Sequence, residues 1–226
     1  MEYKTIACNL LCRFWLSIVL LTATVVSSTD ALAGQGPIEV LRGMSDHVLE
    51  IIKQDPTVLD DKARLRSIAI EVVVPNVDFQ ALSQSVLGIN WRKATPQQRE
   101  IFEREFRELL INTYLSSISR ADYHGQSIKY LPMRYPPNGD MAEVEAEIQQ
   151  PNGPLIHAQF RMYRRVDDWK VYDVVAEGVS LVITQRSSFS SIIRDKGLDG
   201  LIALLEERND KRNQQAASEQ QPATKQ

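Results

Sequence analysis

The chain has 226 residues, and its 26 lysines and arginines are nearly balanced by 29 aspartates and glutamates, for a formal net charge of −3. It contains no dense basic block, so the composition argues against a nucleic-acid-binding protein. Both cysteines, Cys8 and Cys12, lie close to the N-terminus. Neither a disulfide framework nor a thiolate metal site is therefore expected in the rest of the chain.

The N-terminal segment has the pattern of a secretory signal peptide. Lys4 and Arg13 precede an apolar run over residues 14–26, and residues 31–33 read Ala-Leu-Ala, which is typical of a cleavage site. The run is too short for a stable transmembrane helix, although an uncleaved N-terminal anchor is the alternative. We predict that cleavage after Ala33 releases a soluble, exported protein.

The next part of the chain is predicted to be helical. Apolar side chains recur at helical spacing from Pro37, and Pro56 and Pro75 are expected to end the first two helices because proline has no backbone N–H. Asp78 suits the N-cap of a short third helix, and Gly88 suits the residue after its end. The predicted helices span about residues 37–54, 60 or 61 to 74, 79–88 and 96–119.

The fourth predicted helix has the clearest start. Thr95 can cap it, Pro96 suits its first position, and Gln98 can reach back to complete a capping box. Its last turns, which include Leu110 and Tyr114, are apolar on nearly every side. Such a helix is buried all round, so it lies either at the centre of an ordinary core or with one side on a cavity. Close packing makes the first alternative the commoner one.

From residue 126 onward, apolar and polar residues alternate, as in strands that have one solvated face. The alternation is clearest where Glu143, Glu145 and Glu147 separate small apolar residues. Consecutive strands joined by short turns predict an antiparallel meander. The four predicted strands span about residues 127–131, 141–149, 155–165 and 169–177.

The chain is then predicted to return to helix after residues 178–180, which we expect to break the last strand. Gly197 suits the end of one helix, and Asp199 can cap a final one. Helices, a meander and further helices predict an α+β fold with the helices on one face of a twisted sheet. The predicted domain covers residues 34–208, and residues 209–226 are polar enough to predict a disordered tail.

The apolar faces of the predicted strands bound the space between sheet and helices. If Val166 pairs with Trp169 across the last hairpin, the inward positions of three strands fall on one face. Small alanines on that face leave room that either a packed helix or a ligand could fill. These inward positions include Val144, Ala146, Ala158, Phe160, Met162, Val171 and Val175.

Few catalytic patterns are present. His47, His124 and His157 have no metal-binding spacing, so no metal site is predicted. The same strand pairing places Asp173 on the apolar sheet face, where it is a candidate general base. Alternatively, Asp173 accepts hydrogen bonds from the N-terminus of the following helix, or a β-bulge turns it outward. Ser180 is interpreted as the cap of that helix.

Two stretches carry a specific set of residues in order. The C-terminal stretch reads Trp169-Lys-Val-Tyr-Asp-Val-Val-Ala-Glu-Gly-Val-Ser-Leu-Val and continues with Arg186, Phe189 and Lys196-Gly-Leu-Asp-Gly-Leu. The helical stretch contributes Asp78, Phe79, Gly88, Trp91, Ala94, Thr95, Gln98, Phe102, Phe106, Leu109 and Tyr114. With these residues, the chain resembles the MlaC family, also called toluene-tolerance proteins, over about residues 37–208.

The resemblance implies a periplasmic phospholipid carrier in which helices and a twisted sheet surround a deep apolar pocket. Members shuttle lipid between an inner-membrane ABC transporter complex bearing a ring of MCE domains and an outer-membrane lipoprotein–porin complex, and so maintain outer-membrane lipid asymmetry. Phospholipid is the cargo and no cofactor is expected. We expect a monomer that is not an enzyme. The residues expected to contact acyl chains are Leu110, Tyr114, Val144, Ala146, Ala158, Phe160, Met162, Val171 and Val175.

Two other functions remain open at this point. A periplasmic chaperone or adaptor could use the helices to grip other proteins, and a small hydrolase or isomerase could be built around Asp173. A carrier explains the scarcity of catalytic patterns better than either, because acyl chains need an apolar cavity and no convergent polar site.

Overall fold

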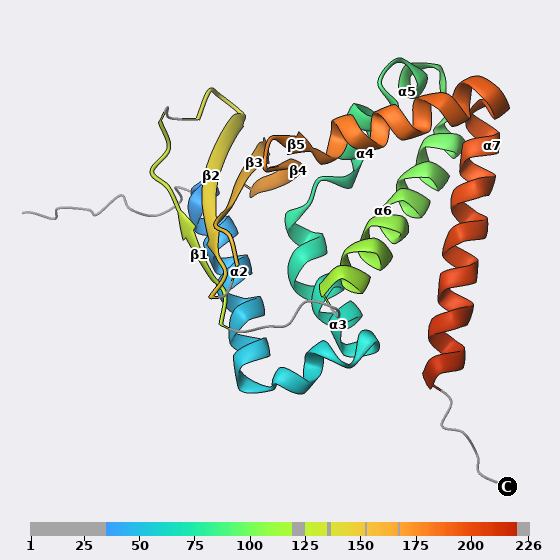
Figure 1. The fold of residues 1–226 in the computed structure, drawn as a ribbon. Coiled ribbons are helices and arrows are strands. Elements are labelled where there is room, and N and C mark those ends of the chain that lie inside the picture. The colour runs from blue at the N-terminus through green and yellow to red at the C-terminus, as the bar shows by residue number, and fades with distance from the viewer. Residues whose placement is uncertain (1–34, 119–124, 135–136, 152, 167, 221–226) are drawn as a thin grey trace, which may run out of the picture. The chain divides into compact units, whose positions relative to one another are not determined.

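The computed structural model describes residues 35–118, 125–134, 137–151, 153–166 and 168–220. All of these belong to one unit, residues 34–226. The predicted signal peptide and His124 lie outside the described residues. A series of helices, a five-stranded antiparallel sheet and a long final helix follow one another along the chain, which confirms the α+β class (Figure 1).

The helices before the sheet start and end close to the predicted positions. Asp61 caps α3 by accepting from the backbone N–H groups of Ala63 and Arg64, each at 3.0 Å. Gly88 has a φ of 55° and follows α4, where a side chain would be strained. The elements are α2 (Pro37–Gln54), η1 (Pro56–Leu59), α3 (Lys62–Ile68), the π-helix η2 (Ala69–Val73), η3 (Val74–Asn76), α4 (Phe79–Leu87), α5 (Ile89–Lys93) and α6 (Pro96–Ile118).

The predicted capping box is present at the start of α6. The backbone N–H of Thr95 donates to Oε1 of Gln98 at 2.9 Å, and the backbone N–H of Gln98 donates to Oγ1 of Thr95 at 3.1 Å. These two bonds satisfy donors that a helix start leaves without partners. The short α5 just before it was not predicted from the sequence.

The sheet has the predicted meander and one additional strand. Its strands, in spatial order, are β1 (Ser127–Tyr130), β2 (Met141–Gln149), β3 (Ile156–Arg165), β4 (Asp168–Ala176) and β5 (Val179–Ser180). The last predicted strand ends at Ala176, close to the expected break, but Val179 and Ser180 form a short fifth strand before the helix begins. Glu177 and Gly178 both have positive φ, 49° and 77°, which closes a tight hairpin turn. Ser180 consequently pairs with Val175.

The last helix, α7 (Leu181–Gln220), bends at Gly197, where φ is 73° and ψ is 177°. The bend lies where the sequence predicts a boundary between two helices. Asp199, the predicted cap, accepts a 2.6 Å hydrogen bond from Nε2 of Gln98 and thereby ties the bend to the start of α6.

The second half of α7 continues to Gln220, so the prediction of a disordered tail is wrong for residues 209–220. Leu201, Leu205 and Asn209 recur every four residues and are all buried. Nδ2 of Asn209 donates to the backbone oxygen and to Oε2 of Glu105 on α6, both at 2.9 Å. Composition alone hides this contact, because beyond Leu205 it includes the buried polar Asn209 and an exposed hydrogen bond from Arg212 to Thr113.

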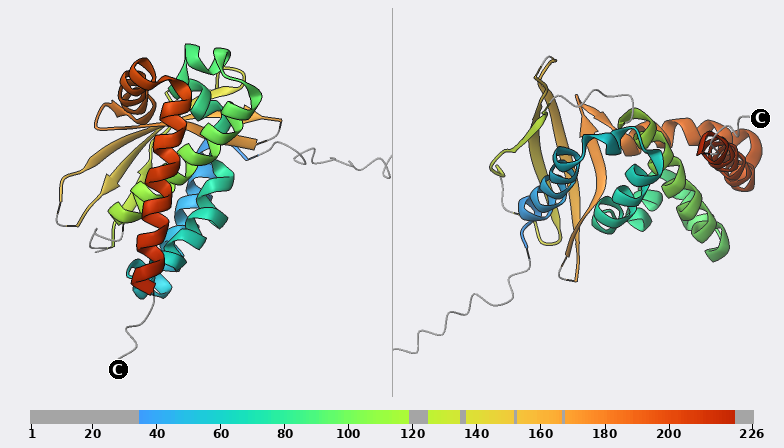
Figure 2. Two further views of the ribbon diagram at one scale, coloured as in Figure 1. Left: turned by 90° about the vertical axis from the view of Figure 1, so that its right-hand side faces the viewer. Right: turned by 90° about the horizontal axis from the view of Figure 1, so that it is seen from below.

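The two faces of the sheet differ in character. Helix α2 packs on one face, where Leu41 is fully buried against Val144 and Met162. The other face carries charged cross-strand pairs such as Arg161 with Glu143, whose closest atoms are 3.4 Å apart. The right-hand view of Figure 2 shows the green α6 and the red α7 extending away from the orange β4 side of the sheet.

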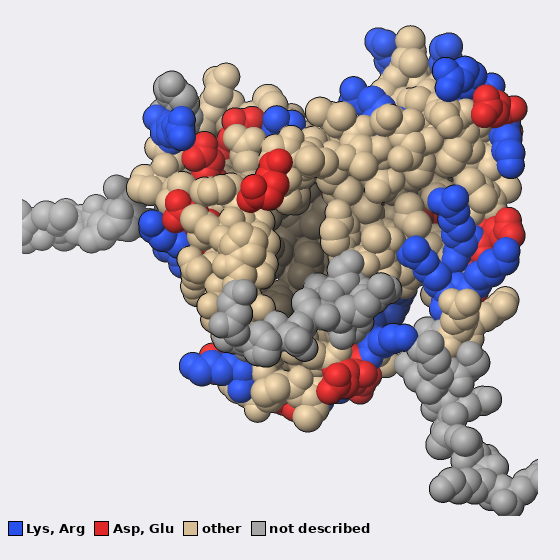
Figure 3. All heavy atoms as spheres, viewed as in Figure 1, with Lys and Arg blue, Asp and Glu red and all other residues tan. Residues whose placement is uncertain are grey.

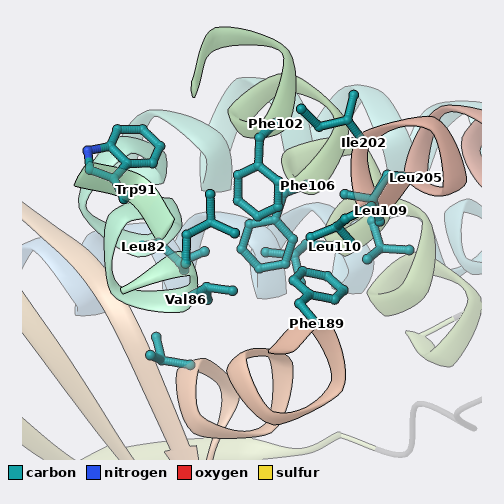
Figure 4. Packing of buried hydrophobic residues seen from close by; sticks show 13 residues of the cluster. Leu82, Val86, Trp91, Phe102, Phe106, Leu109, Leu110, Phe189, Ile202 and Leu205 are labelled. Carbon is teal, nitrogen blue, oxygen red and sulfur yellow. The ribbon is translucent and has the colours of Figure 1, made fainter. Parts of the chain in front are cut away.

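An aromatic core joins α6 to α7 and α4 (Figure 4). The rings of Phe102 and Phe106 stack with centroids 5.4 Å apart, and Phe189 meets both edge-on at 6.0 and 5.6 Å. Leu82 and Leu205 close the cluster from either side. The first half of α6 therefore lies in an ordinary, filled core.

Candidate functional site

A cavity of about 570 Å³ lies between β4 and the helices, within the range of small-molecule sites. Figure 3 shows the surface hollowed between the sheet and the helices, with neither blue nor red groups inside. None of the described lining residues is charged, and only Tyr114, Thr184 and Gln185 have polar side-chain groups. The lining comprises Ala69, Val73, Val74, Val77, Phe79, Leu82, Leu110, Ile111, Tyr114, Leu115, Val171, Val174, Ala176, Val179, Leu181, Thr184 and Gln185.

The second half of α6 forms one wall of this cavity. Leu110 belongs both to the aromatic core and to the lining, while Ile111 and Leu115 face the cavity alone. Tyr114 is half exposed at the rim. Loss of solvation raises the pKa of its phenol above the usual value, and the nearby negative charge of Asp173 adds to the effect. The last turns of α6 therefore border a cavity on one side, and half-exposed Tyr114 shows that they are not buried all round as expected.

Strand β4 forms the opposite wall, and a bulge decides which of its residues line the cavity. Arg161 pairs with Asp173, but the next residue of β3, Met162, pairs with Val171, so one residue of β4 is left over. The extra residue shifts the alternation by one. Val174 and Ala176 then line the cavity together with Val171. The predicted face, with Asp173 and Val175 inward, is wrong for this reason.

Asp173 is 2% exposed and lies at the junction of β4, β5 and α7. Its carboxylate accepts from the backbone N–H of Val182 at 3.0 Å, from Oγ of Ser180 at 2.7 Å and from the guanidinium of Arg161 at 3.1 Å. Oγ of Ser180 in turn accepts from the backbone N–H of Ile183 at 3.1 Å. Both structural expectations, a helix-terminal acceptor and a bulge, are confirmed, and so is the capping role of Ser180.

Three of the nine predicted acyl-chain residues, Leu110, Tyr114 and Val171, line the cavity. The structure places the other six outside the lining of this cavity. Val144 and Met162 are fully buried beneath α2, so a packed helix fills that part of the sheet face. The remaining four are Ala146, Ala158, Phe160 and Val175.

These four residues have other neighbours. Ala146 and Ala158 pair with each other and are buried, and the ring of Phe160 lies 6.5 Å from that of Tyr130. Val175 pairs with Gln159 and Ser180 after the bulge.

Sequence reasoning missed the segment that closes the cavity from the α3 side. Ala69, Val73 and Val74 of η2 and η3 line it, followed by Val77 and Phe79. The backbone N–H of Asp78 donates to the backbone oxygen of Val171 at 2.8 Å, so this segment runs beside β4. Nothing local in the sequence signals that pairing, although a π-helix such as η2 is frequent at functional sites.

The described residues hold no group of three or more metal-ligating side chains in reach of one ion. Within the same ranges, no helix is long and apolar enough to cross a membrane.

A family model described as MlaC protein matches residues 42–207. The chain belongs to the MlaC family. It is 26% identical over 199 residues to the intermembrane phospholipid transport system binding protein MlaC of Haemophilus influenzae, covering 85% of this chain and 92% of that protein. It is 25% identical over 176 residues to toluene tolerance protein ttg2D of Pseudomonas putida, covering 74% of this chain and 78% of that one.

A solved structure shows the same architecture. The phospholipid-binding protein of Ralstonia solanacearum, in complex with a phospholipid, superposes with a TM-score of 0.69 and 28% sequence identity. The match covers 77% of this chain and 97% of that one. The α+β fold is thus shared with a protein solved in complex with a phospholipid.

Proposed function

We propose that this chain is an exported phospholipid carrier that holds acyl chains in the cavity between β4 and α6. The observation that carries the proposal is the uncharged, almost wholly apolar lining of that cavity. Leu110, Tyr114 and Val171 are the sequence-predicted acyl-chain contacts that this cavity retains. The phospholipid bound by the Ralstonia solanacearum relative supports the same ligand class.

The energetics of lipid transfer explain why a cavity is needed. Two acyl chains expose roughly thirty methylenes to water, an unfavourable free energy on the order of 20 kcal/mol at about 0.8 kcal/mol each. An apolar cavity removes most of this penalty by shielding the chains. The polar head group can stay in water at the rim, beside Tyr114, Thr184 and Gln185.

The proposal includes the cellular route. The signal-peptide pattern of residues 1–33 supports export to the periplasm and cleavage after Ala33. There the protein acts as a monomer that shuttles lipid between the MCE-domain ABC transporter complex of the inner membrane and the lipoprotein–porin complex of the outer membrane. This exchange maintains lipid asymmetry of the outer membrane. The system named for the Haemophilus influenzae relative, intermembrane phospholipid transport, supports this placement.

The proposed activity is carriage and not catalysis, with phospholipid as cargo and no cofactor. Asp173 is the one candidate general base, and its carboxylate accepts three hydrogen bonds at the start of α7. It lies behind the cavity wall and is not part of the lining.

The decisive experiment is mass spectrometry of lipid extracted from protein purified without detergent. We expect phospholipid to co-purify with the wild type and to be lost when bulky side chains fill the cavity. Protein that carries no phospholipid, and takes none up from vesicles, contradicts the proposal. N-terminal sequencing of the exported protein tests the route, since retention of Met1 contradicts release after Ala33.

A further inference from the structure

The end of the domain formed by α5 and the first half of α7 has an excess of positive charge. Residues 89–93 and 181–200 contain five cations and two carboxylates, whereas the whole chain has a net charge of −3. All five cations are exposed, and Figure 3 shows blue side chains gathered over this end of the molecule. We call this surface the basic end, and its cations are Arg92, Lys93, Arg186, Arg194 and Lys196.

Contacts within the basic end leave most of this charge uncompensated. The guanidinium of Arg186 donates to the backbone oxygen of Ser85, a neutral acceptor that holds α7 against α4. Arg194 and Asp195 are 3.9 Å apart at their closest atoms, with side chains 78% and 68% exposed, so solvent screens their attraction. The other carboxylate, that of Asp199, accepts from the neutral amide of Gln98, so five cations and two carboxylates leave a net charge of +3 on this surface.

Exposed apolar side chains accompany these cations. On α7, Val182 and Phe189 face the core, and Ile183 on the outer side is 62% exposed. Ile89 at the start of α5 is 57% exposed. Val179 is 63% exposed and also lines the cavity. The apolar outer residues of this region therefore extend from the cavity mouth toward the basic end.

We infer that the basic end docks directly on an anionic lipid bilayer, with Ile89, Ile183 and Val179 entering the head-group region. Exposed apolar groups flanked by lysine and arginine are typical of proteins that bind at the membrane interface. A bilayer complements both features at once, and docking there brings the mouth of the cavity to the lipids. The inference rests on the proposed function, because a cavity for acyl chains gives the docking its purpose.

The test is co-sedimentation of the purified, processed protein with vesicles. We expect binding to vesicles of phosphatidylglycerol and phosphatidylethanolamine, weak binding to phosphatidylcholine vesicles, and release from the anionic vesicles at high salt, because salt screens exposed charges. Each cation near an anionic surface is expected to contribute about fivefold in affinity, equivalent to about 1 kcal/mol. The double variant Arg194→Gln/Lys196→Gln should therefore bind on the order of 25-fold more weakly.

Matched variants separate this surface from net charge. Lys53→Gln/Lys129→Gln removes the same charge from exposed positions on α2 and β1 and should leave vesicle binding within about twofold of wild type, since the charges lie outside the basic end. Ile183→Ser should weaken binding to the anionic vesicles at low salt, because it removes apolar insertion without changing the charge. Thermal unfolding of each variant verifies that it folds.

Three outcomes overturn the inference: no wild-type binding to anionic vesicles at low salt, an equal loss in both double variants, or no loss in either. Failure of wild-type binding would leave an acidic protein as the alternative ligand of the basic end. Lipid extracted from the same protein samples separates this inference from the proposed function. If the protein carries phospholipid but does not bind vesicles, only the inference of bilayer docking is contradicted. If the purified protein carries no phospholipid, the proposed carrier function is contradicted.

Discussion

Both halves of α6 bury apolar side chains, but in very different surroundings. Around the first half, Phe102 and Phe106 meet Phe189 with ring centroids 5.4 to 6.0 Å apart, and no residue of this trio is more than 3% exposed. Around the second half, Ile111 and Leu115 face a cavity of about 570 Å³. One helix thus belongs to a filled core at one end and to a hollow site at the other.

The difference lies in what stands opposite the helix. The filled half faces α7 and α4, whose aromatic and leucine side chains reach across the interhelical space. The hollow half faces β4, which presents Val171, Val174 and Ala176. Short side chains opposite a helix leave a gap, and the lining residues forfeit dispersion contacts unless a ligand supplies them. Apolar composition therefore indicates that a helix face is buried. The size of the side chains on the element opposite that face decides whether it borders a filled core or a cavity.

The largest expected effect comes from truncating the filled half. Phe106→Ala should lower the free energy of unfolding by about 3–5 kcal/mol, because it removes a fully buried ring and leaves a void. Leu115→Ala, on the cavity wall, should cost about 1 kcal/mol, since that side chain already borders a void. Urea unfolding monitored by circular dichroism measures both. Equal costs would mean that the two halves of α6 pack alike.

The second-largest effect on stability is expected at Asp173 and its hydrogen-bond partners behind the cavity wall. Asp173→Asn weakens the acceptors for Arg161, Ser180 and the backbone N–H of Val182, and should cost about 2–3 kcal/mol. Glu143→Gln is the matched control: it removes the exposed carboxylate partner of the same Arg161 and should cost under about 0.5 kcal/mol. Lipid content per folded molecule should be unchanged in both. A well-folded Asp173→Asn variant that loses turnover of some substrate would revive the enzyme interpretation.

A pair of cross-strand alanines compares core with cavity directly. Ala158 and Ala176 are register partners on β3 and β4, but Ala158 is buried and Ala176 is an exposed cavity-lining residue. Ala158→Trp should overpack and destabilise by about 1–3 kcal/mol. Ala176→Trp should cost less than about 1 kcal/mol and displace lipid. Mass spectrometry of bound lipid and unfolding measurements on both variants test this comparison. Loss of lipid from Ala158→Trp but not from Ala176→Trp would mean that the lipid lies beside Ala158 instead.

The contact between α6 and the second half of α7 continues the filled core that surrounds the first half of α6. Asn209→Ala removes both hydrogen bonds to Glu105 and should lower the free energy of unfolding by about 1–2 kcal/mol. Arg212→Ala loses one exposed hydrogen bond to Thr113 and should cost under about 0.5 kcal/mol. If deleting residues 209–226 left stability unchanged, the contact of this segment with α6 would contribute nothing to the stability of the fold.

The smallest expected effect on stability concerns Glu103, a half-buried residue in the first half of α6. Burial raises the pKa of its carboxyl above 4.5, against the effect of Arg107. The folded state therefore binds this proton more tightly than the unfolded chain, and ionisation lowers stability at neutral pH. Glu103→Gln should stabilise by about 0.5 kcal/mol or less, because solvent screens the group.

The pH dependence tests the origin of that gain. The difference in melting temperature between Glu103→Gln and wild type should vanish as the pH falls below 4.5, where the carboxyl is neutral in both states. A gain that persists at acid pH would come from packing. Glu100→Gln, at a neighbouring exposed position, controls for the general change in charge.

Much of the fold is predictable from local sequence. Thr95 with Gln98 specifies the start of α6, Asp61 the start of α3, and Gly197 the bend of α7, because caps and positive-φ positions act within a few residues. The two-residue periodicity likewise gives the main strands of the meander. The site was predicted less well, since Val144 and Met162 proved to be core beneath α2.

By itself, the sequence determined the type and order of the main helices and strands and the resemblance to the family, because period and caps are local properties and the motifs can be read along the chain. Only the tertiary structure decided which apolar residues face the cavity. The bulge between Arg161 and Met162 shifts the face of β4, and the pairing of Val77 with Val171 brings η3 beside it. Both depend on contacts between residues distant in sequence, and an apolar side chain is equally compatible with a packed core and a lipid cavity until those contacts are made.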